Sequence, residues 1–172
     1  MAAPHTLVTG VTKCGKTTLC KQLAADFKAR GKKVALCDIL PPEFRRGWKY
    51  DVFVPPELLG RFIVEKRDYV IFCDEASDYI GHDPAMQQIV KKAANYGHYL
   101  FIISQRARMV HPSTRGQCST LITFRQSRND GRILTDEFCR EGLDPEEIVR
   151  LAPGSYLYSP GPGSPAHLCK VF

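Results

Sequence analysis

The residues best suited to chemistry in this chain form a glycine-rich loop near its start. Residues 10–17 read Gly-Val-Thr-Lys-Cys-Gly-Lys-Thr and fit the phosphate-binding pattern G-x-x-x-x-G-K-[ST]. Backbone N–H groups of such a loop, with the amino end of the following helix, hold phosphate oxygens. We expect Lys16 to reach the β- and γ-phosphates and the Thr17 hydroxyl to ligate Mg²⁺. The residues predicted to surround the nucleotide are Gly10, Val11, Thr12, Lys13, Cys14, Gly15, Lys16, Thr17 and Thr18.

Two adjacent acids, Asp74 and Glu75, follow the apolar run of residues 69–73. The carboxyl ends of parallel strands meet at one edge of a sheet, so we expect these acids opposite the loop. We predict that Asp74 holds Mg²⁺ through water and that Glu75 orients and deprotonates the attacking water. Hydrolysis needs a base of this kind, whereas phosphate binding alone does not. The alternative is a solvated strand end without a chemical role.

A further polar group, Gln105, follows the apolar run of residues 99–103. We expect it at the same sheet edge, where its amide could contact the γ-phosphate and the attacking water. Three arginines, Arg106, Arg108 and Arg115, follow closely. One of them could act in trans as an arginine finger on a neighbouring subunit. A solvated or structural charge is the alternative for each.

The elements that must position these residues alternate between strands and helices. Residues 6–9 read as a strand before the loop, and Leu19, Leu23 and Phe27 give the helix after it an apolar face. Further strands are expected at residues 33–38, 68–74, 99–103 and 120–124, with an edge strand at 155–158. Helices are expected from residue 55 and over residues 83–96, 111–118 and 144–151, and a hairpin-like turn is expected at 128–132. This alternation predicts an α/β sandwich with a parallel sheet and right-handed crossovers.

Length and composition favour one ordinary folded domain. The chain has 172 residues, of which 44% are hydrophobic and 24% charged, and these values exclude fibrous and disordered classes. We expect a domain over 1–158, followed by a Pro/Gly-rich segment over 159–172. Apolar runs do not exceed five residues, whereas a membrane span needs about 20. No secretory signal pattern opens the chain.

Cysteine and charge patterns bound the compartment and the partners. The seven cysteines lack C-x-x-C spacing and the histidines His82, His98 and His111 lack metal-ligand spacing. We therefore expect reduced thiols, a cytoplasmic location, and Cys20, Cys37 and Cys73 in the core. The net charge of +6 suits a polyanion. A nucleic-acid backbone could be contacted by Arg125, Arg128, Arg132 and Lys91–Lys92, which otherwise form a solvated surface.

Taken together, the motifs resemble those of the additional-strand P-loop ATPases. The glycine loop, the Asp74–Glu75 pair, the run Ser104-Gln105-Arg106 and the stretch from His111 to Arg125 carry the resemblance. They are similar to the HerA/FtsK group, which includes viral genome-packaging ATPases and the Zot-like proteins of phages. The resemblance covers about residues 5–126.

The resemblance implies a RecA-like, three-layer sandwich whose mainly parallel sheet has the core order 5-1-4-3-2. It implies ATP and Mg²⁺ as cofactors, double-stranded DNA as a partner, and a homo-oligomeric ring, usually a hexamer, that docks on a viral capsid or portal vertex protein. It implies Lys16, Glu75 and Gln105 as catalytic groups, with Arg108 or Arg115 as the finger of the next subunit's site. The location implied is the host cytoplasm, with a virion-associated form. No separate DNA-binding or membrane domain is expected.

Two other functions stay open at this stage. A short P-loop chain with Asp74-Glu75-Ala76 also resembles the short thymidine kinases, but those carry a zinc ribbon and this chain has no paired cysteines. The other alternative is a nucleotide-dependent assembly protein that is not an enzyme. The guanine motif Asn-Lys-x-Asp is absent, which argues against a GTPase switch.

Overall fold

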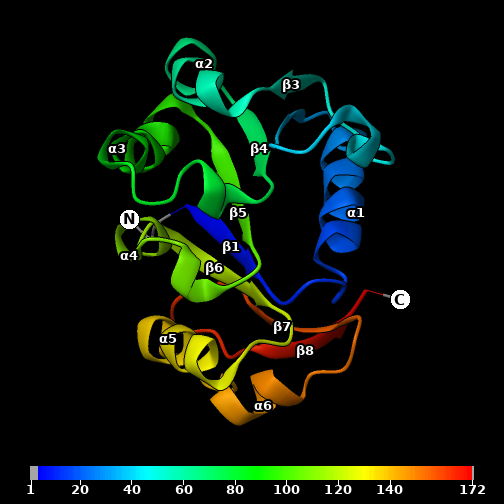
Figure 1. The fold of residues 1–172 in the computed structure, drawn as a ribbon, viewed down its shortest axis with the longest axis vertical. Helices are drawn as coiled ribbons and strands as arrows, with labels where there is room; N and C mark the ends of the chain where they lie inside the picture. Colours follow the sequence, from blue (N-terminus) through cyan, green and yellow to red (C-terminus); the bar gives the residue numbers. More distant parts are fainter. Residues whose placement is uncertain (1–3, 172) are drawn as a thin grey trace.

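The order of the strands decides which loops meet. In the computed structural model, which describes residues 4–171, eight strands form one sheet in the order β3-β2-β4-β5-β1-β6-β7-β8 (Figure 1). The strands are β1 (His5–Thr9), β2 (Lys33–Cys37), β3 (Val52–Val54), β4 (Tyr69–Cys73), β5 (Tyr99–Ser104), β6 (Cys118–Thr123), β7 (Ser155–Ser159) and β8 (His167–Lys170). All pairings up to β6 are parallel, and β7 and β8 add antiparallel pairings. The predicted α/β class with a mainly parallel sheet is confirmed.

The five strands expected from the sequence correspond to β1, β2, β4, β5 and β6. Numbered in that way, their order in the sheet reads 5-1-4-3-2. Strand β5 therefore lies between β1 and β4. Because these strands are parallel, the segments that follow β1, β4 and β5 emerge side by side at one edge.

Helices cover the two faces of the sheet unequally (Figure 1). Helix α1 (Lys16–Ala29) covers one face. The other face carries α2 (Leu59–Glu65), α3 (Pro84–Ala93), α4 (Pro112–Arg115), α5 (Arg128–Phe138) and α6 (Pro145–Arg150). Short 3₁₀ turns lie at Pro42–Arg45 (η1), Pro56–Leu58 (η2), Ala76–Asp78 (η3), Ala94–Tyr96 (η4) and Ala107–Met109 (η5).

Alternating side chains of the strands form two cores, one on each face. Leu7 of β1 packs under α3 and α5, whereas its neighbour Val8 packs under α1. On the α1 side, the rings of Phe72 and Phe101 stack with centroids 4.5 Å apart, and Phe27 of α1 meets both rings edge-on. These contacts hold α1, and with it the glycine loop, against the sheet.

The hairpin-like turn expected at 128–132 is wrong, because these residues begin α5. The Asn-Asp-Gly signal is overridden by a helix cap, in which the Ser127 hydroxyl accepts from the Asp130 N–H and donates to its carboxylate. Gly131 lets the helix approach α6, since a Cβ there would lie 3.4 Å from the Cα of Pro145. Leu134 and Phe138 then bury the apolar face of the helix.

The strand predicted at 155–158 is confirmed as β7, but its predicted place at the edge of the sheet is wrong, because β8 pairs antiparallel along its outer side. Strand β8 lies in the segment expected to be Pro/Gly-rich loop. It is mostly exposed, so it lacks the apolar run that marks a strand in sequence. Strand β3, with three residues, was not predicted for a related reason, since it is too short to show a pattern.

The predicted core placement of Cys20, Cys37 and Cys73 is confirmed, since all three are buried. Among residues 4–171, no group of three or more His, Cys, Asp or Glu side chains is placed to hold a metal ion. His98 accepts from the Tyr69 N–H and bonds to the Ile63 oxygen, and His111 caps α4, as structural residues do. No helix among the described residues has the length and apolar character to cross a membrane.

A buried histidine ties the start of β1 to its surroundings. His5 is fully buried, and its Nδ1 accepts from the Leu100 N–H at 3.2 Å. Its Nε2 must therefore carry the proton that is donated to the Val90 oxygen at 3.1 Å. Burial lowers the pKa of His5 to about 4. A protonated ring could not accept from Leu100, so the neutral form belongs to the fold.

We expect this histidine to make the fold sensitive to acid. Neutral His5 stabilises the fold fully above the pKa of about 6.5 that the residue has in the unfolded chain. As the pH falls from 6.5 toward 4, this stabilisation is lost, and the free energy of unfolding decreases by about 3 kcal/mol. His5→Gln should have a lower free energy of unfolding at pH 7.5 but a flatter pH dependence between pH 7 and 4. Denaturant unfolding at several pH values measures this. Parallel pH curves for the two proteins would contradict the assignment.

Candidate active site

The glycine loop crosses from β1 to α1 over a surface that leaves no room for a side chain at Gly10 or Gly15. A Cβ on Gly10 would lie 2.5 Å from the Cβ of Phe124 and 2.9 Å from the Sγ of Cys14. Gly15 has a left-handed φ of +111°, and a Cβ there would lie 3.2 Å from the Phe124 ring. Glycine is needed at both positions, so that the backbone can form a close cradle at the amino end of α1.

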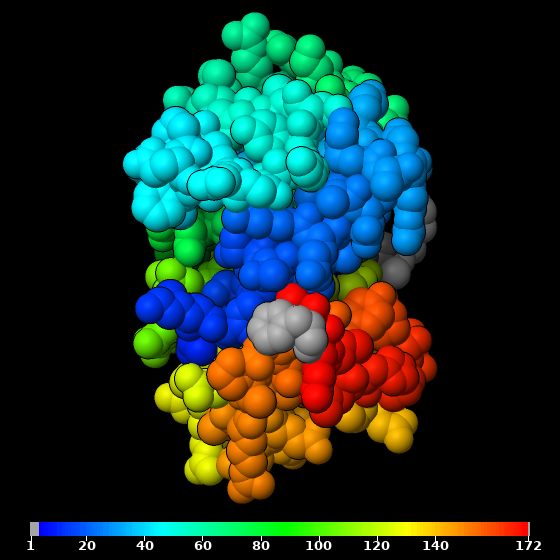
Figure 2. Space-filling model, turned by 90° about the vertical axis from the view of Figure 1, so that its right-hand side faces the viewer, coloured from blue at the N-terminus to red at the C-terminus, as the bar shows by residue number. Residues whose placement is uncertain are grey.

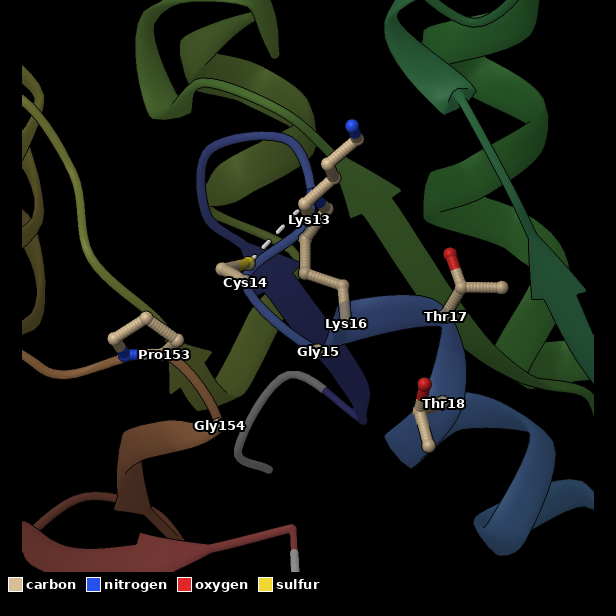
Figure 3. Close-up of a pocket in the computed structure, with 8 residues that line it drawn as sticks. All are labelled: Lys13, Cys14, Gly15, Lys16, Thr17, Thr18, Pro153 and Gly154. Atoms are coloured by element: carbon tan, nitrogen blue, oxygen red, sulfur yellow. Dashed lines mark hydrogen bonds between the residues drawn. The ribbon is translucent and has the colours of Figure 1, made fainter.

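The loop borders a cavity of about 320 Å³. Figure 3 shows its lining residues, which are Lys13, Cys14, Gly15, Lys16, Thr17, Thr18, Pro153 and Gly154. The last two come from the loop between α6 and β7, and the Gly154 N–H donates to the Cys14 oxygen at 3.0 Å. Figure 2 shows the face on which α1 and the C-terminal segment lie together. Sequence reasoning missed Pro153 and Gly154, because nothing in their local sequence signals this contact.

The loop lysine lies buried inside the cradle. The Lys16 ammonium donates to the Gly10 oxygen at 2.6 Å and to the Val11 oxygen at 3.1 Å. Its Nζ also lies 3.9 Å from the Cys14 sulfur. The Lys13 side chain is exposed and extends away from the loop in Figure 3. Of the two lysines, Lys16 is therefore the one placed to meet phosphate at the cradle.

The two acids emerge where β4 ends. Asp74 is almost fully buried, and its backbone N–H donates to the Cys37 oxygen of β2 at 2.9 Å. Burial, reinforced by the nearby carboxylates of Asp38 and Glu75, raises the pKa of Asp74 to about 6, although Lys16 acts in the opposite direction. A cation at this carboxylate would favour its ionised form.

Glu75, Gln105 and Thr12 form a continuous hydrogen-bonded row across three loops. Gln105 Nε2 donates to Glu75 Oε1 at 3.2 Å, and Thr12 Oγ1 donates to Gln105 Oε1 at 3.3 Å. Glu75 has a left-handed φ of 48°, which is uncommon for a residue with a Cβ. The structure thus brings the glycine loop, the acid after β4 and the amide after β5 together, as the sequence predicted.

The predicted arginines differ sharply in their surroundings. The Arg115 side chain is only 7% exposed and forms a two-point ion pair with Glu137 of α5. It also donates to the oxygens of Ala107 and Val110. This placement argues against Arg115 as the predicted finger, because its guanidinium is already engaged in hydrogen bonds within the chain. Arg108 is exposed, and its backbone N–H donates to Asp130 Oδ1 at 3.0 Å.

The residues present fit a nucleoside triphosphate with Mg²⁺. The close backbone cradle that Gly10 and Gly15 allow the glycine loop to form suits phosphate oxygens. The Thr17 hydroxyl, exposed in the first turn of α1, and the Asp74 carboxylate are hard oxygen ligands of the kind that Mg²⁺ prefers. Thr17 and Asp74 would therefore hold the metal.

The basic cluster considered for nucleic-acid contacts lies at the surface. Arg125, Arg128, Arg132, Lys91 and Lys92 are all exposed. Arg128 forms an ion pair with Glu146 at 2.7 Å. The Arg125 oxygen accepts from the Val11 N–H at 3.0 Å, so this arginine lies beside the glycine loop.

The loop between β1 and α1, the acids after β4, and the amide after the intervening strand β5 define a P-loop ATPase with a RecA-like sheet. Residues 3–123 match the model of a family described as AAA domain. The match spans more than half of the chain, and the chain belongs to this family. A comparison with curated protein sequences gives no match.

Solved structures share the fold over nearly the whole chain. The genome-packaging NTPase B204 of Sulfolobus turreted icosahedral virus 2, in complex with sulfate, has a TM-score of 0.81 and 17% identity, with 99% of this chain and 98% of that chain covered. B204 of Sulfolobus turreted icosahedral virus has a TM-score of 0.79, 16% identity and 98% coverage of both chains. The plasmid coupling protein TrwB has a TM-score of 0.72 and 11% identity, with 99% and 86% covered. The resemblance drawn from the motifs is confirmed at the level of fold.

The two clashes at Gly10 predict a specific loss of nucleotide binding. Gly10→Ala should lower the affinity for an ATP analogue at least tenfold, and stability by about 1–3 kcal/mol, because Phe124 and Cys14 must shift. Gly161→Ala is a matched control, since Gly161 has the same φ of +159° but nothing within 4 Å of its Cβ position. Titration with a fluorescent analogue and thermal denaturation measure the two effects. Equal behaviour of the two variants would contradict the packing argument.

Proposed function

We propose that this ATPase moves double-stranded DNA as part of a homo-oligomeric ring, and that it packages a phage or viral genome. The observation that carries the proposal is the row Thr12–Gln105–Glu75, which joins the phosphate cradle to an acid suited to activate water. The fold supports the DNA-handling part, since the similar structures are a genome-packaging NTPase and a plasmid coupling protein. B204 is also described in complex with AMPPCP and with ATP-γS.

The residues of the site divide the work of hydrolysis. The Lys16 ammonium exchanges its carbonyl partners for oxygens of the β- and γ-phosphates. Glu75 accepts a proton from the attacking water, whose oxygen bonds to the γ-phosphorus while the bond to the bridging oxygen of ADP breaks. Gln105 orients this water, because its amide already contacts Glu75. Thr17 and Asp74 would hold Mg²⁺, which when bound would supply positive charge that offsets charge on the phosphates.

The same row links nucleotide state to the rest of the molecule. Gln105 contacts the loop residue Thr12 and the acid Glu75 and lies three residues before Arg108. Loss of the γ-phosphate changes the contacts of Gln105, and the exposed Arg108 of one subunit lies on the same short loop. We propose Arg108 as the finger that completes the neighbouring subunit's site.

Contacts with the DNA backbone are supported by the net charge of +6 and by the exposed basic side chains of Arg125, Arg132, Lys91 and Lys92. A capsid or portal vertex protein is the proposed docking partner, with the host cytoplasm and the virion as the proposed locations. The nucleoside kinase and the assembly protein receive no support from the structural comparisons, because the similar structures handle DNA.

A steady-state assay of phosphate release with double-stranded DNA, single-stranded DNA or no DNA tests the proposal. We expect double-stranded DNA to stimulate turnover several-fold, and the stimulation to fall steeply as salt rises. Glu75→Gln should bind ATP with unchanged affinity while turnover falls by about 10²-fold or more, since the base is lost. Phosphate transfer to an added nucleoside, without stimulation by DNA, would favour the kinase instead.

The finger is tested by mixing two inactive variants. In a ring of Arg108→Ala and Glu75→Gln subunits, some sites pair a normal Glu75 with a normal Arg108 from the next subunit. Random mixing at equal amounts should restore roughly a quarter of wild-type turnover. Mixing Arg115→Ala with Glu75→Gln should restore less turnover. The substitution Arg115→Ala removes the ion pair with Glu137 and so destabilises every subunit that contains it. No recovery with Arg108→Ala at any ratio would exclude it as a finger.

A further inference from the structure

A buried glutamine lies directly beneath the proposed sensor. Gln126 follows β6 and is only 3% exposed. Its Nε2 donates to Thr9 Oγ1 at 2.5 Å and to the backbone oxygen of Gln105 at 3.2 Å. Thr9 is the last residue of β1, immediately before the glycine loop. One amide thus fastens the start of the loop to the backbone of Gln105.

The orientation of this amide follows from its partners. The Gln105 carbonyl oxygen can only accept, so the NH₂ group of Gln126 must face it. The Gln126 Oε1 therefore points elsewhere, and it is buried with no hydrogen-bond partner among residues 4–171. A buried oxygen without a donor lowers stability. A role in the site explains such a group better than a contribution to stability does.

The same segment holds the other end of the sensor loop. Asp130, four residues beyond Gln126 and fully buried, accepts from the Arg108 N–H. Gln126, which precedes α5, and Asp130, in the first turn of α5, therefore fix the backbone at residues 105 and 108 by two separate hydrogen bonds. The loop that carries Gln105 and Arg108 is held as one unit.

We propose that Gln126 is a positioning residue for ATP hydrolysis. Its amide fixes the Gln105 backbone relative to β1, and the Gln105 side chain is thereby kept between Glu75 and Thr12. The inference rests on the proposed function, because it requires Gln105 to act on the attacking water. Gln126 is not among the residues that line the cavity, and its amide bonds to Thr9 and Gln105.

Gln126→Met tests this role, since methionine has a similar length but neither donates to Gln105 nor buries an unpaired oxygen. We expect turnover to fall about tenfold, equivalent to the loss of one ordinary hydrogen bond in the transition state. The affinity for ADP should stay unchanged, whereas the ratio of ATP-γS to ADP affinity should fall. The thermal midpoint should change little, because two hydrogen bonds and one unpaired oxygen are removed together. Gln126→Asn, one methylene shorter, should show the same pattern and serves if the methionine variant does not fold.

A double-mutant cycle separates positioning from a merely structural role. If Gln126 acts through Gln105, adding Gln126→Met to Gln105→Ala should lower turnover no further. If the double variant instead loses turnover by the product of the two single losses, the inference is wrong. Normal turnover of Gln126→Met would also overturn it. Normal turnover of Gln105→Ala would instead remove the sensor role from the proposed function, which distinguishes the two failures.

His5→Gln is the matched control at the opposite end of β1. His5 is also buried and also makes two hydrogen bonds to neighbouring segments. This variant should lose thermal stability and keep its turnover per folded molecule. If its turnover falls as much as that of Gln126→Met, the effect belongs to general weakening of β1 and the proposed role of Gln126 is wrong.

Discussion

The position of β5 between β1 and β4 is the constraint on which the site depends. Because these strands are parallel, the glycine loop, Gln105 and the acids Asp74 and Glu75 leave the sheet at one edge and in that lateral order. Gln105 can therefore contact the loop on one side and Glu75 on the other. In another strand order, Gln105 would not lie between the glycine loop and Glu75.

The segment that follows β6 supports this edge from below. Phe124, fully buried, packs against Gly10 and Gly15 and sets how closely the loop approaches the sheet. The next residues hold Val11, Thr9 and Gln105 through hydrogen bonds, and the start of α5 holds Arg108. The glycine loop and the segment that carries Gln105 and Arg108 thus share one support, and a movement of this support would reach both.

Burial, as well as hydrogen bonding, sets the state of the charged side chains in the site. Lys16 is held by carbonyl oxygens and not by a carboxylate, so its charge is available to phosphate. Asp74 is buried beside two other acids, which raises its pKa and makes a bound cation favourable there. The Lys16 ammonium and the buried Asp74 carboxylate thus lie in surroundings that suit a negatively charged nucleotide and a cation.

The sequence by itself determined the chemistry of the glycine loop and the location of the acids and the amide, because each depends on residue types at short spacing beside an apolar strand. Only the tertiary structure distinguished the arginines, since Glu137, which forms the ion pair with Arg115, lies 22 residues away in the chain. The fold also turned residues 128–132 into a helix, where the cap at Ser127 and packing against Pro145 outweigh the local preference of Asn-Asp-Gly for a turn. Pro153, Gly154 and Gln126 join the site through contacts between distant segments, and such contacts leave no periodic or local pattern in the sequence.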